Sequence, residues 1–421
     1  GDVLFVTENK AHVLAARALG MTAIQVRPPD GNEGDIDSLT ELLPRVPEFV
    51  GGDCVQFGDS VLRRGEVQAE ARARQSELRR VVQHGRTYQK AHPEVRVLAD
   101  KGRYLVVEVE PDAPADVTAD DFPCYSVREI PWGGSIFDVK KRIPRQPDPA
   151  VQKCVDTVSA QQFETDLRTL VDFGTRHSTS VQFTQATDWA QNQLGAAGYQ
   201  TRTETVSVFG KPSHNVIADR FGSAPEPRDV VLVTAHLDSI NIAGGPAAPA
   251  PGADDNGSGS AGVLAIARAI QHHEGERDIR FILFGGEEEG LFGSLAYVAA
   301  LSPAERGRIS AVVNMDMIAS VNAPAPTVLL EGATLSQQVI DGLADAAHTY
   351  TGLTVQTSLH PYNSDHVPFI DAGIPAVSTI EGADGANDRI HTADDTMAFI
   401  DVDLAVEILR MNVAFVVATL G

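Results

Sequence analysis

Acidic side chains and a histidine follow three apolar segments near the middle of the chain, at the point where each segment ends. The groups are His236 after Val230–Ala235, Glu287 and Glu288 after Ile279–Phe284, and Asp316 after Ala311–Met315. Short apolar runs of this kind are typical of buried strands, and sites on parallel sheets lie at the carboxyl ends of the strands. We therefore expect these side chains to lie close together.

Imidazole and carboxylate groups are ligands that zinc takes in hydrolytic sites, and a pair of such metals shares one carboxylate. Neighbouring loops add His366 and the pair Asp254-Asp255. Successive side chains diverge, so Glu287 and Glu288 are expected to divide into one ligand and one free base beside a metal-activated water. These residues predict a two-metal hydrolase.

Two further aspartates are placed to orient the histidines. Asp238, two residues after His236, is expected to accept the imidazole N–H that faces away from the metal. Asp365, the residue before His366, is expected to orient that histidine in a similar way.

Five motifs in this order resemble those of the M28-type di-zinc aminopeptidases, which are similar to bacterial leucyl aminopeptidases. The resemblance covers about residues 155–421, and its motifs are His236-Leu-Asp238-Ser, Gly252-Ala-Asp254-Asp255-Asn-Gly-Ser258-Gly259, Glu287-Glu288-Glu289-Gly290-Leu291, Asn314-Met-Asp316-Met and Ser364-Asp365-His366. Each motif is weak by itself, but the ordered set is specific.

The resemblance implies a role for each residue. Asp255 would bridge two Zn²⁺ ions, and Glu287 would be the general base. One zinc would be held by Asp255, Glu288 and His366, and the other by His236, Asp255 and Asp316. The Asp255–Asn256 peptide bond is expected to be cis. Tyr362 and His391 are expected to anchor substrate or to support the ligands.

The implied activity is removal of N-terminal residues from peptides that carry a free amino terminus. One alternative hypothesis is a glutaminyl cyclase with one zinc, a class that has a C-terminal motif like His391-Thr-x-Asp394-Asp395. Another is a carboxypeptidase or dipeptidase of the same superfamily. The set of metal ligands and the general base is complete, which argues against a non-catalytic binding module. By the same resemblance the protein is expected to be secreted or periplasmic.

Composition restricts the partners. The formal net charge of −23 argues against binding to nucleic acid or to an anionic membrane surface, since both attract basic proteins. No apolar run approaches the roughly 20 residues that span a bilayer. We expect a monomer.

The chain starts at Gly1 without a signal-type segment, which suggests a processed or trimmed product. Its three cysteines allow at most one disulfide; they are Cys54, Cys124 and Cys154.

The order of elements predicts an α/β fold with a mixed, largely parallel sheet flanked by helices, as in zinc exopeptidases of the phosphorylase/hydrolase-like class. We expect this catalytic domain over residues 156–421, a linker over 146–155 and a smaller α+β domain over 1–145. Helices are predicted at Phe163–Phe173, Ala186–Ala197, Ser260–Ile270, Gln337–Tyr350 and Val402–Leu420, and further strands at Gln200–Phe209, Ser213–Arg220 and Ala376–Ile380.

The N-terminal region gives weaker signals. Residues 1–50 resemble the closing βαβα part of a haloacid-dehalogenase-like domain, with strands at Val3–Val6 and Ala23–Val26 and helices at Lys10–Leu19 and Ser38–Leu43, but lack its nucleophilic aspartate. Residues 58–92 are rich in Arg, Glu, Gln and Ala, which predicts a long exposed helix. We expect residues 1–145 to be a prosegment, with an inhibitor, a folding aid or an accessory domain as alternatives.

Overall fold

The computed structural model describes residues 4–7, 22–25, 53–73, 76–110, 124–143 and 145–421. These residues form two compact units. The larger unit contains the described parts of residues 79–108, 113–128 and 139–421, and the smaller one those of 1–78, 109–112 and 129–138. This division differs from the boundary at 146–155 that the sequence suggests, because two N-terminal segments belong to the larger unit.

The larger unit is built on a mixed sheet with the strand order β10-β11-β13-β12-β14-β17-β15-β16. Its strands are β10 Gln200–Val208, β11 Lys211–Arg220, β12 Val230–His236, β13 Asp278–Phe284, β14 Ile309–Met315, β15 Thr327–Gly332, β16 Thr354–Ser358 and β17 Ala376–Glu381. The central strands β13, β12, β14 and β17 run parallel to one another, whereas β10, β11 and β15 introduce antiparallel pairs. The predicted α/β fold with a mixed, largely parallel sheet is confirmed.

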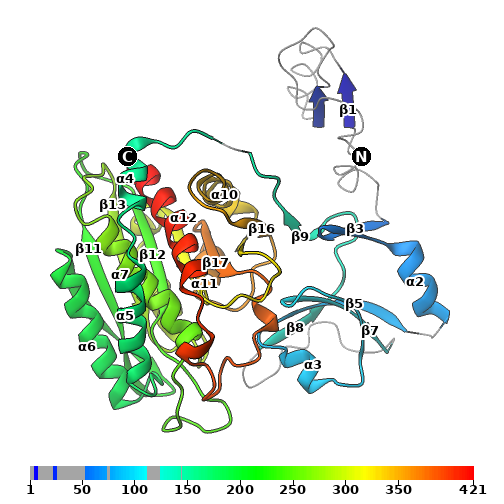
Figure 1. Ribbon diagram of the computed structural model, residues 1–421, viewed down its shortest axis with the longest axis horizontal. Helices are drawn as coiled ribbons and strands as arrows, with labels where there is room; N and C mark the ends of the chain where they lie inside the picture. Colours follow the sequence, from blue (N-terminus) through cyan, green and yellow to red (C-terminus); the bar gives the residue numbers. More distant parts are fainter. Residues whose placement is uncertain (1–3, 8–21, 26–52, 74–75, 111–123, 144) are drawn as a thin grey trace. The chain divides into compact units, whose positions relative to one another are not determined.

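Helices cover both faces of this sheet, as Figure 1 shows. One face packs against α4 Pro149–Val155, α5 Ala160–Asp172, α6 Val181–Ala196, α7 Gly259–Ala269, α10 Gln337–Tyr350 and α12 Val402–Leu420. The other face packs against α8 Phe292–Ala300 and α11 His366–Asp371, and α9 Pro303–Arg308 leads into β14.

Strand β12 illustrates why the central strands have continuous apolar sequences. Val231 and Val233 pack into the core under α7 and α12, while Leu232 between them packs into the core under α8 and α11. Successive side chains of a strand point to opposite faces, so a strand that is covered on both sides must be apolar throughout. The predicted helices and strands of residues 160–420 agree with the structure to within a few residues at each end.

A second, four-stranded sheet has the order β6-β7-β5-β8, and we call it the small sheet. Its strands are β5 Glu77–Gln83, β6 Arg96–Asp100, β7 Tyr104–Val109 and β8 Tyr125–Arg128, and α3 Thr87–Ala91 follows β5. The long helix predicted over residues 58–92 is therefore wrong. Helical propensity was overridden because Leu78, Val81 and Val82 are buried in a strand that pairs between β7 and β8.

The smaller unit contains β1 Leu4–Thr7 and β2 Thr22–Gln25, which pair in parallel near the two strands predicted for residues 1–50. The helices predicted at Lys10–Leu19 and Ser38–Leu43 lie outside the described residues. In the same unit β3 Cys54–Gly58 pairs with β4 Ser60–Arg63 and with β9 Ser135–Val139, and α2 spans Arg64–Ala73.

Among the described residues, no helix is both long and apolar enough to cross a membrane. Cys54, Cys124 and Cys154 are free thiols rather than members of a disulfide.

Candidate metal centre

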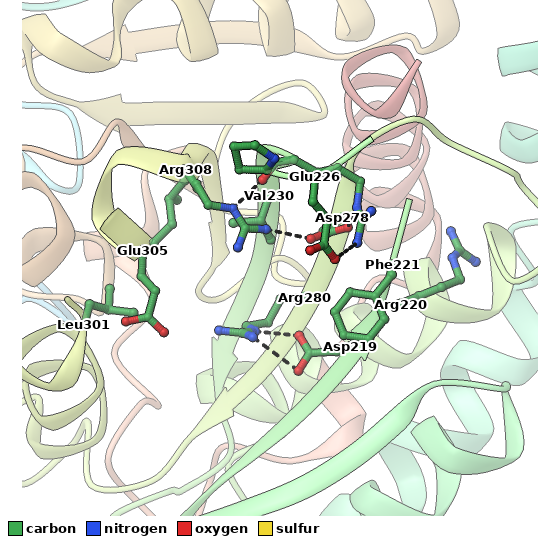
Figure 2. A pocket seen from close by; sticks show the side chains of 13 residues that line it. Asp219, Arg220, Phe221, Glu226, Val230, Asp278, Arg280, Leu301, Glu305 and Arg308 are labelled. Carbon is green, nitrogen blue, oxygen red and sulfur yellow. Dashed lines mark hydrogen bonds and ion pairs between the residues drawn. The ribbon is translucent and has the colours of Figure 1, made fainter. Parts of the chain in front are cut away.

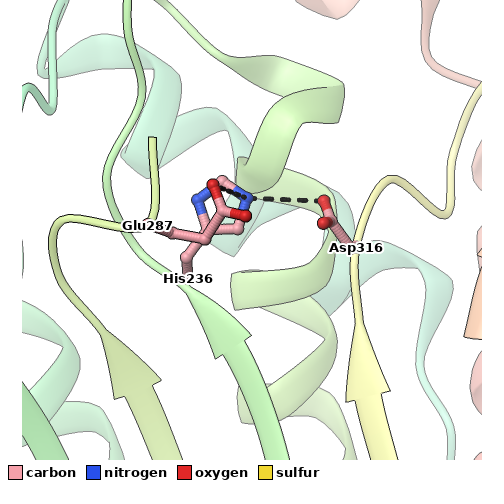
Figure 3. A group of neighbouring side chains, drawn as sticks. All are labelled: His236, Glu287 and Asp316. Atoms are coloured by element: carbon pink, nitrogen blue, oxygen red, sulfur yellow. Dashed lines mark hydrogen bonds and ion pairs between the residues drawn. The ribbon is translucent and has the colours of Figure 1, made fainter. Parts of the chain in front are cut away.

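The predicted cluster forms where three parallel strands end. His236 is the last residue of β12, Asp316 directly follows β14, and Glu287 comes three residues after β13. Figure 3 shows these side chains converging beyond the strand ends. Asp255 approaches from the segment Ala253–Ser258, which leads into α7 and contains a cis Asp255–Asn256 peptide bond, as the sequence resemblance implied.

His236 lies as close to two carboxylates as two ligands of one zinc ion lie to each other. Its Nε2 is 3.3 Å from Asp255 Oδ1 and 3.4 Å from Asp316 Oδ1. Glu287 Oε2 is slightly farther, at 4.0 Å from the same nitrogen. All these side chains are buried or nearly so, so that the nitrogen and the carboxylate oxygens face one another with little access for bulk water.

The second histidine of the cluster is His391, which lies in the loop after β17. Its Nε2 is 3.0 Å from Asp255 Oδ2 and 3.0 Å from Glu288 Oε2. The two oxygens of Asp255 thus face two different histidines, which is the arrangement that a bridging carboxylate requires. The ring of His391, predicted to anchor substrate or to support the ligands, thus lies within the carboxylate cluster itself.

The structure does not bring His366, which was predicted to be a metal ligand, into this cluster. Its side chain is fully buried, and its nearest carboxylate is that of Glu331, with an Nε2 to Oε1 distance of 3.7 Å. Neither ring nitrogen has a hydrogen-bond partner within the described part of the chain. The reason is positional: His366 starts α11, and its ring lies beside Glu331 on β15 instead of turning toward Asp255.

Asp238 positions the two glutamates in addition to lying near His236. Its carboxylate accepts hydrogen bonds from the backbone N–H groups of Glu287, at 3.3 Å, and Glu288, at 3.1 Å. His236 Nδ1 lies 3.2 Å from the backbone carbonyl oxygen of Asp238 and 3.7 Å from its carboxylate. The expected contact between imidazole and Asp238 therefore forms chiefly through the backbone.

Further hydrogen bonds fix the remaining acids. Ser364 Oγ donates to Asp316 Oδ2 at 2.6 Å, and Asn314 Nδ2 donates to that hydroxyl at 3.0 Å. Asp395 accepts from the backbone N–H groups of Asp254, at 2.9 Å, and Asp255, at 3.0 Å. Because Asp395 follows His391 by four residues, it ties the loop of His391 to the segment that presents Asp255.

Burial and mutual repulsion dominate the electrostatics of the cluster. Burial raises the pKa of Glu288 to about 7, with a further contribution from the neighbouring charge of Asp255. Burial also raises the pKa of Glu287 well above its usual value. Against the lowering effect of burial, the carboxylates of Glu288 and Asp255 raise the pKa of His391. The site therefore favours added positive charge.

This donor set fits divalent metal ions. His236 forms two groups whose ligand atoms all lie within 4.8 Å of one another, one with Glu287 and Asp316 and one with Asp255 and Glu288. Four buried carboxylates face only two imidazoles here, and buried charge without a partner is costly. In addition, the buried Glu288 Oε1 has no hydrogen-bond partner among the described residues.

A cavity gives access to the cluster, and two residues of its wall come from the small sheet. They are His84 and Cys124, which line the cavity together with Glu287, Glu288 and His391. Sequence reasoning missed both, because the segment of His84 was predicted to be an exposed helix. Tyr362 lies beside this wall, with its ring 5.6 Å from the His84 ring.

A larger hollow at the opposite ends of the same strands is a weaker candidate. It lies around the starts of β12, β13 and β14 (Figure 2), and three of its arginines, Arg228, Arg280 and Arg308, already pair with carboxylates. Arg228 and Arg308 both pair with Asp278, at 2.6 and 2.7 Å. The charges that would recognise a ligand are thus neutralised within the protein.

Comparison with known proteins agrees with this location of the site. Residues 215–416 match the model of peptidase family M28. Over 202 residues the chain is 37% identical to the leupeptin-inactivating enzyme 1 of Streptomyces exfoliatus, and this match covers 47% of the chain and 42% of that protein. The chain thus spans about two fifths of the length of this curated relative.

Two solved structures share the fold. A zinc aminopeptidase from Bacillus subtilis superposes with a TM-score of 0.55 at 18% identity, over 62% of this chain and 95% of that one. A glutaminyl cyclase from Porphyromonas gingivalis superposes with a TM-score of 0.51 at 22% identity, over 62% of this chain and 99% of that one.

Proposed function

Residues 215–416 of this chain belong to peptidase family M28, and we propose that the protein is a zinc-dependent exopeptidase that removes N-terminal residues from peptides. The observation that carries this proposal is the position of Asp255, whose two carboxylate oxygens face His236 and His391 separately. A carboxylate shared in this way is what a two-metal hydrolytic site requires.

The proposed ligands form two sets that share Asp255. His236 and Asp316 complete one set, and Glu288 and His391 complete the other. This differs from the ligand set expected from the sequence by the exchange of His366 for His391. Each set offers one imidazole nitrogen and two carboxylates, which leaves a position open for water or substrate, as catalytic zinc sites do.

The chain's own contribution to the reaction is a positioned base. Zinc supplies Lewis acidity, which lowers the pKa of water toward neutrality and stabilises negative charge that develops on oxygen. Glu287 takes a proton from the attacking water and passes it to the leaving amine. Asp238 holds the backbone of Glu287 and Glu288, so that one side chain serves as base while the other serves as ligand.

Glu287→Gln tests the base. The amide keeps the shape of the side chain but takes up no proton, so kcat should fall by roughly 10²–10⁴-fold while both zinc ions stay bound. Glu289→Gln is the matched control, because Glu289 lies two residues after Glu287 but pairs with His177 instead of the cluster. Near-wild-type turnover of Glu287→Gln with two zinc ions bound would disprove the assignment.

The same zinc measurement separates the related activities. An exopeptidase of the proposed kind binds two zinc ions per chain and cleaves leucine p-nitroanilide but not its N-acetylated form. One zinc per chain with conversion of N-terminal glutamine to pyroglutamate would indicate a cyclase instead. Cleavage at a free carboxyl terminus would indicate a carboxypeptidase.

A further inference from the structure

Arg103, from the turn before β7 of the small sheet, is buried among side chains of the larger sheet and its loops. It is 2% exposed. Its guanidinium binds both carboxylate oxygens of Glu331 on β15, at 2.8 and 3.0 Å, and Asp384 Oδ2 at 2.7 Å. Both acids are fully buried as well. Asp384 belongs to the same loop as His391, so Arg103 holds this loop against β15.

The backbones meet as closely as the side chains. A Cβ atom on Gly102 would lie 2.7 Å from the carbonyl oxygen of Ala383, and one on Gly385 would lie 2.7 Å from the Cα of Arg103. The backbone N–H of Arg86 also donates to the carbonyl oxygen of Gly385 at 2.8 Å. The small sheet therefore packs directly against the start of the loop that presents His391.

Cys124, the residue before β8, touches the ring of His391 itself. Its Sγ is 3.9 Å from His391 Nδ1, within hydrogen-bonding range for sulfur. The other ring nitrogen, Nε2, faces Asp255 and Glu288. A partner on the outer nitrogen of a metal-binding imidazole fixes its tautomer and its orientation.

We propose that Arg103 and Cys124 are positioning residues for His391, so that the small sheet is a permanent part of the metal centre and not a removable prosegment. Arg103 fixes the loop, and Cys124 fixes the ring. This inference rests on the proposed zinc site, but it concerns residues outside the part of the chain that matches the peptidase family.

The character of this contact separates a permanent part from a prosegment. Release of the small sheet would remove Arg103, the cation that neutralises Glu331 and Asp384, and would break its three charged hydrogen bonds together. The peptidase part is therefore built to keep this sheet.

Cys124→Ala tests the ring contact without disturbing the ion pairs of Arg103. We expect zinc affinity at one of the two sites to fall by about tenfold or more, as for other partners of metal-binding histidines, in a competition titration with a chromophoric chelator. Cys124→Ser, which retains a polar partner, should recover part of the loss. Cys154→Ala is the matched control, because Cys154 lies in α4 and not in the cavity wall. Equal zinc affinities of Cys124→Ala and Cys154→Ala would overturn the role of Cys124.

Arg103→Lys tests the loop contact, since lysine keeps the charge but does not bind Glu331 and Asp384 simultaneously in a fork. We expect weaker zinc binding at one site and normal binding at the other. Arg96→Lys on β6 is the control, because its side chain is 54% exposed in its pair with Glu108. Equal zinc affinities of the two variants would contradict the role of Arg103.

Cleavage of the intact chain at a protease site engineered between Gln146 and Pro147 distinguishes the two views of the N-terminal part. The two fragments should co-elute in gel filtration with both zinc ions retained. Release of the N-terminal fragment with unchanged or increased activity would show a prosegment and overturn the proposal. If wild-type protein binds zinc with these dependencies but cleaves no peptide, the proposed function fails and the positioning role stands.

Discussion

The exchange of His366 for His391 as a metal ligand is open to a direct test with the matched pair His391→Gln and His366→Gln. Glutamine retains a polar side chain of similar length in both variants but removes the imidazole. In the structure only the ring of His391, of these two, lies within 3.0 Å of Asp255 and Glu288 oxygens. The two variants should therefore differ in zinc content, although both change a buried histidine.

The magnitude follows from the position of each ring. Loss of a partner that merely orients a ligand already costs about 10–100-fold in metal affinity. Loss of His391 removes the ligand itself, so we expect more than about 100-fold at one site, or about 2.8 kcal/mol. His366 is 3.7 Å from Glu331 and outside the cluster, so both zinc ions should remain in His366→Gln.

The assay is zinc per chain after gel filtration, measured by atomic emission, together with chelator competition. We expect about one bound zinc in His391→Gln and about two in wild type and in His366→Gln. Loss of one zinc from His366→Gln with full retention in His391→Gln would refute the geometric assignment and restore the one expected from sequence. Thermal unfolding of each apo-protein monitors folding separately.

Three further predictions concern catalysis, stability and pH. Asp238→Asn replaces one of the two carboxylate oxygens that accept from the backbone N–H groups of Glu287 and Glu288, and the lost hydrogen bond costs about 1–3 kcal/mol. In a steady-state assay kcat should fall by roughly tenfold or more, while zinc content is unchanged. Gly102→Ala should lower the melting temperature more than Gly210→Ala. Both glycines have positive φ, which costs alanine about 1–2 kcal/mol, but only at Gly102 would the new Cβ meet backbone atoms. Equal shifts of the melting temperature would contradict this packing. Burial lowers the pKa of His366 to about 4, so the unfolded chain binds a proton near pH 6.5 that the folded chain does not. The free energy of unfolding should therefore fall by up to about 3 kcal/mol as the pH drops from about 6.5 to 4, and urea unfolding of His366→Gln should show a smaller fall.

The catalytic half of the chain could be predicted well because its signals are local. Apolar runs such as Val230–Ala235 are covered on both faces of the sheet, and the polar residue that follows each run must then lie at the edge of the sheet. Gly198 and the spacing of apolar residues predicted helix ends to within a few residues. The expected position of Asp238 followed from its short sequence distance to His236, whereas the choice of Asp255 over Asp254 came from the family resemblance.

The N-terminal part could not be predicted in the same way. Residues 77–83 combine Glu, Leu, Arg, Val and Gln, which suit an exposed helix as well as a strand, and pairing with β7 and β8 decided between the two. The burial of Arg103 was equally invisible, because its partners Glu331 and Asp384 are more than two hundred residues away in the sequence. Charged residues are mostly exposed in proteins, so a buried one is not predicted from sequence unless its partner is known.

By itself the sequence determined which groups are available for chemistry: two adjacent glutamates after a buried strand, a pair of adjacent aspartates, and histidines at a strand end or in loops. These follow from residue type and short-range spacing. Tertiary structure alone decided that His391, and not His366, faces Asp255, and that Arg103 and Cys124 of the small sheet support it. The physical reason is that His391 lies in a loop and His366 at the first position of a short helix, where no periodicity of the sequence directs the side chain. Their directions are set by contacts with segments far away in the chain.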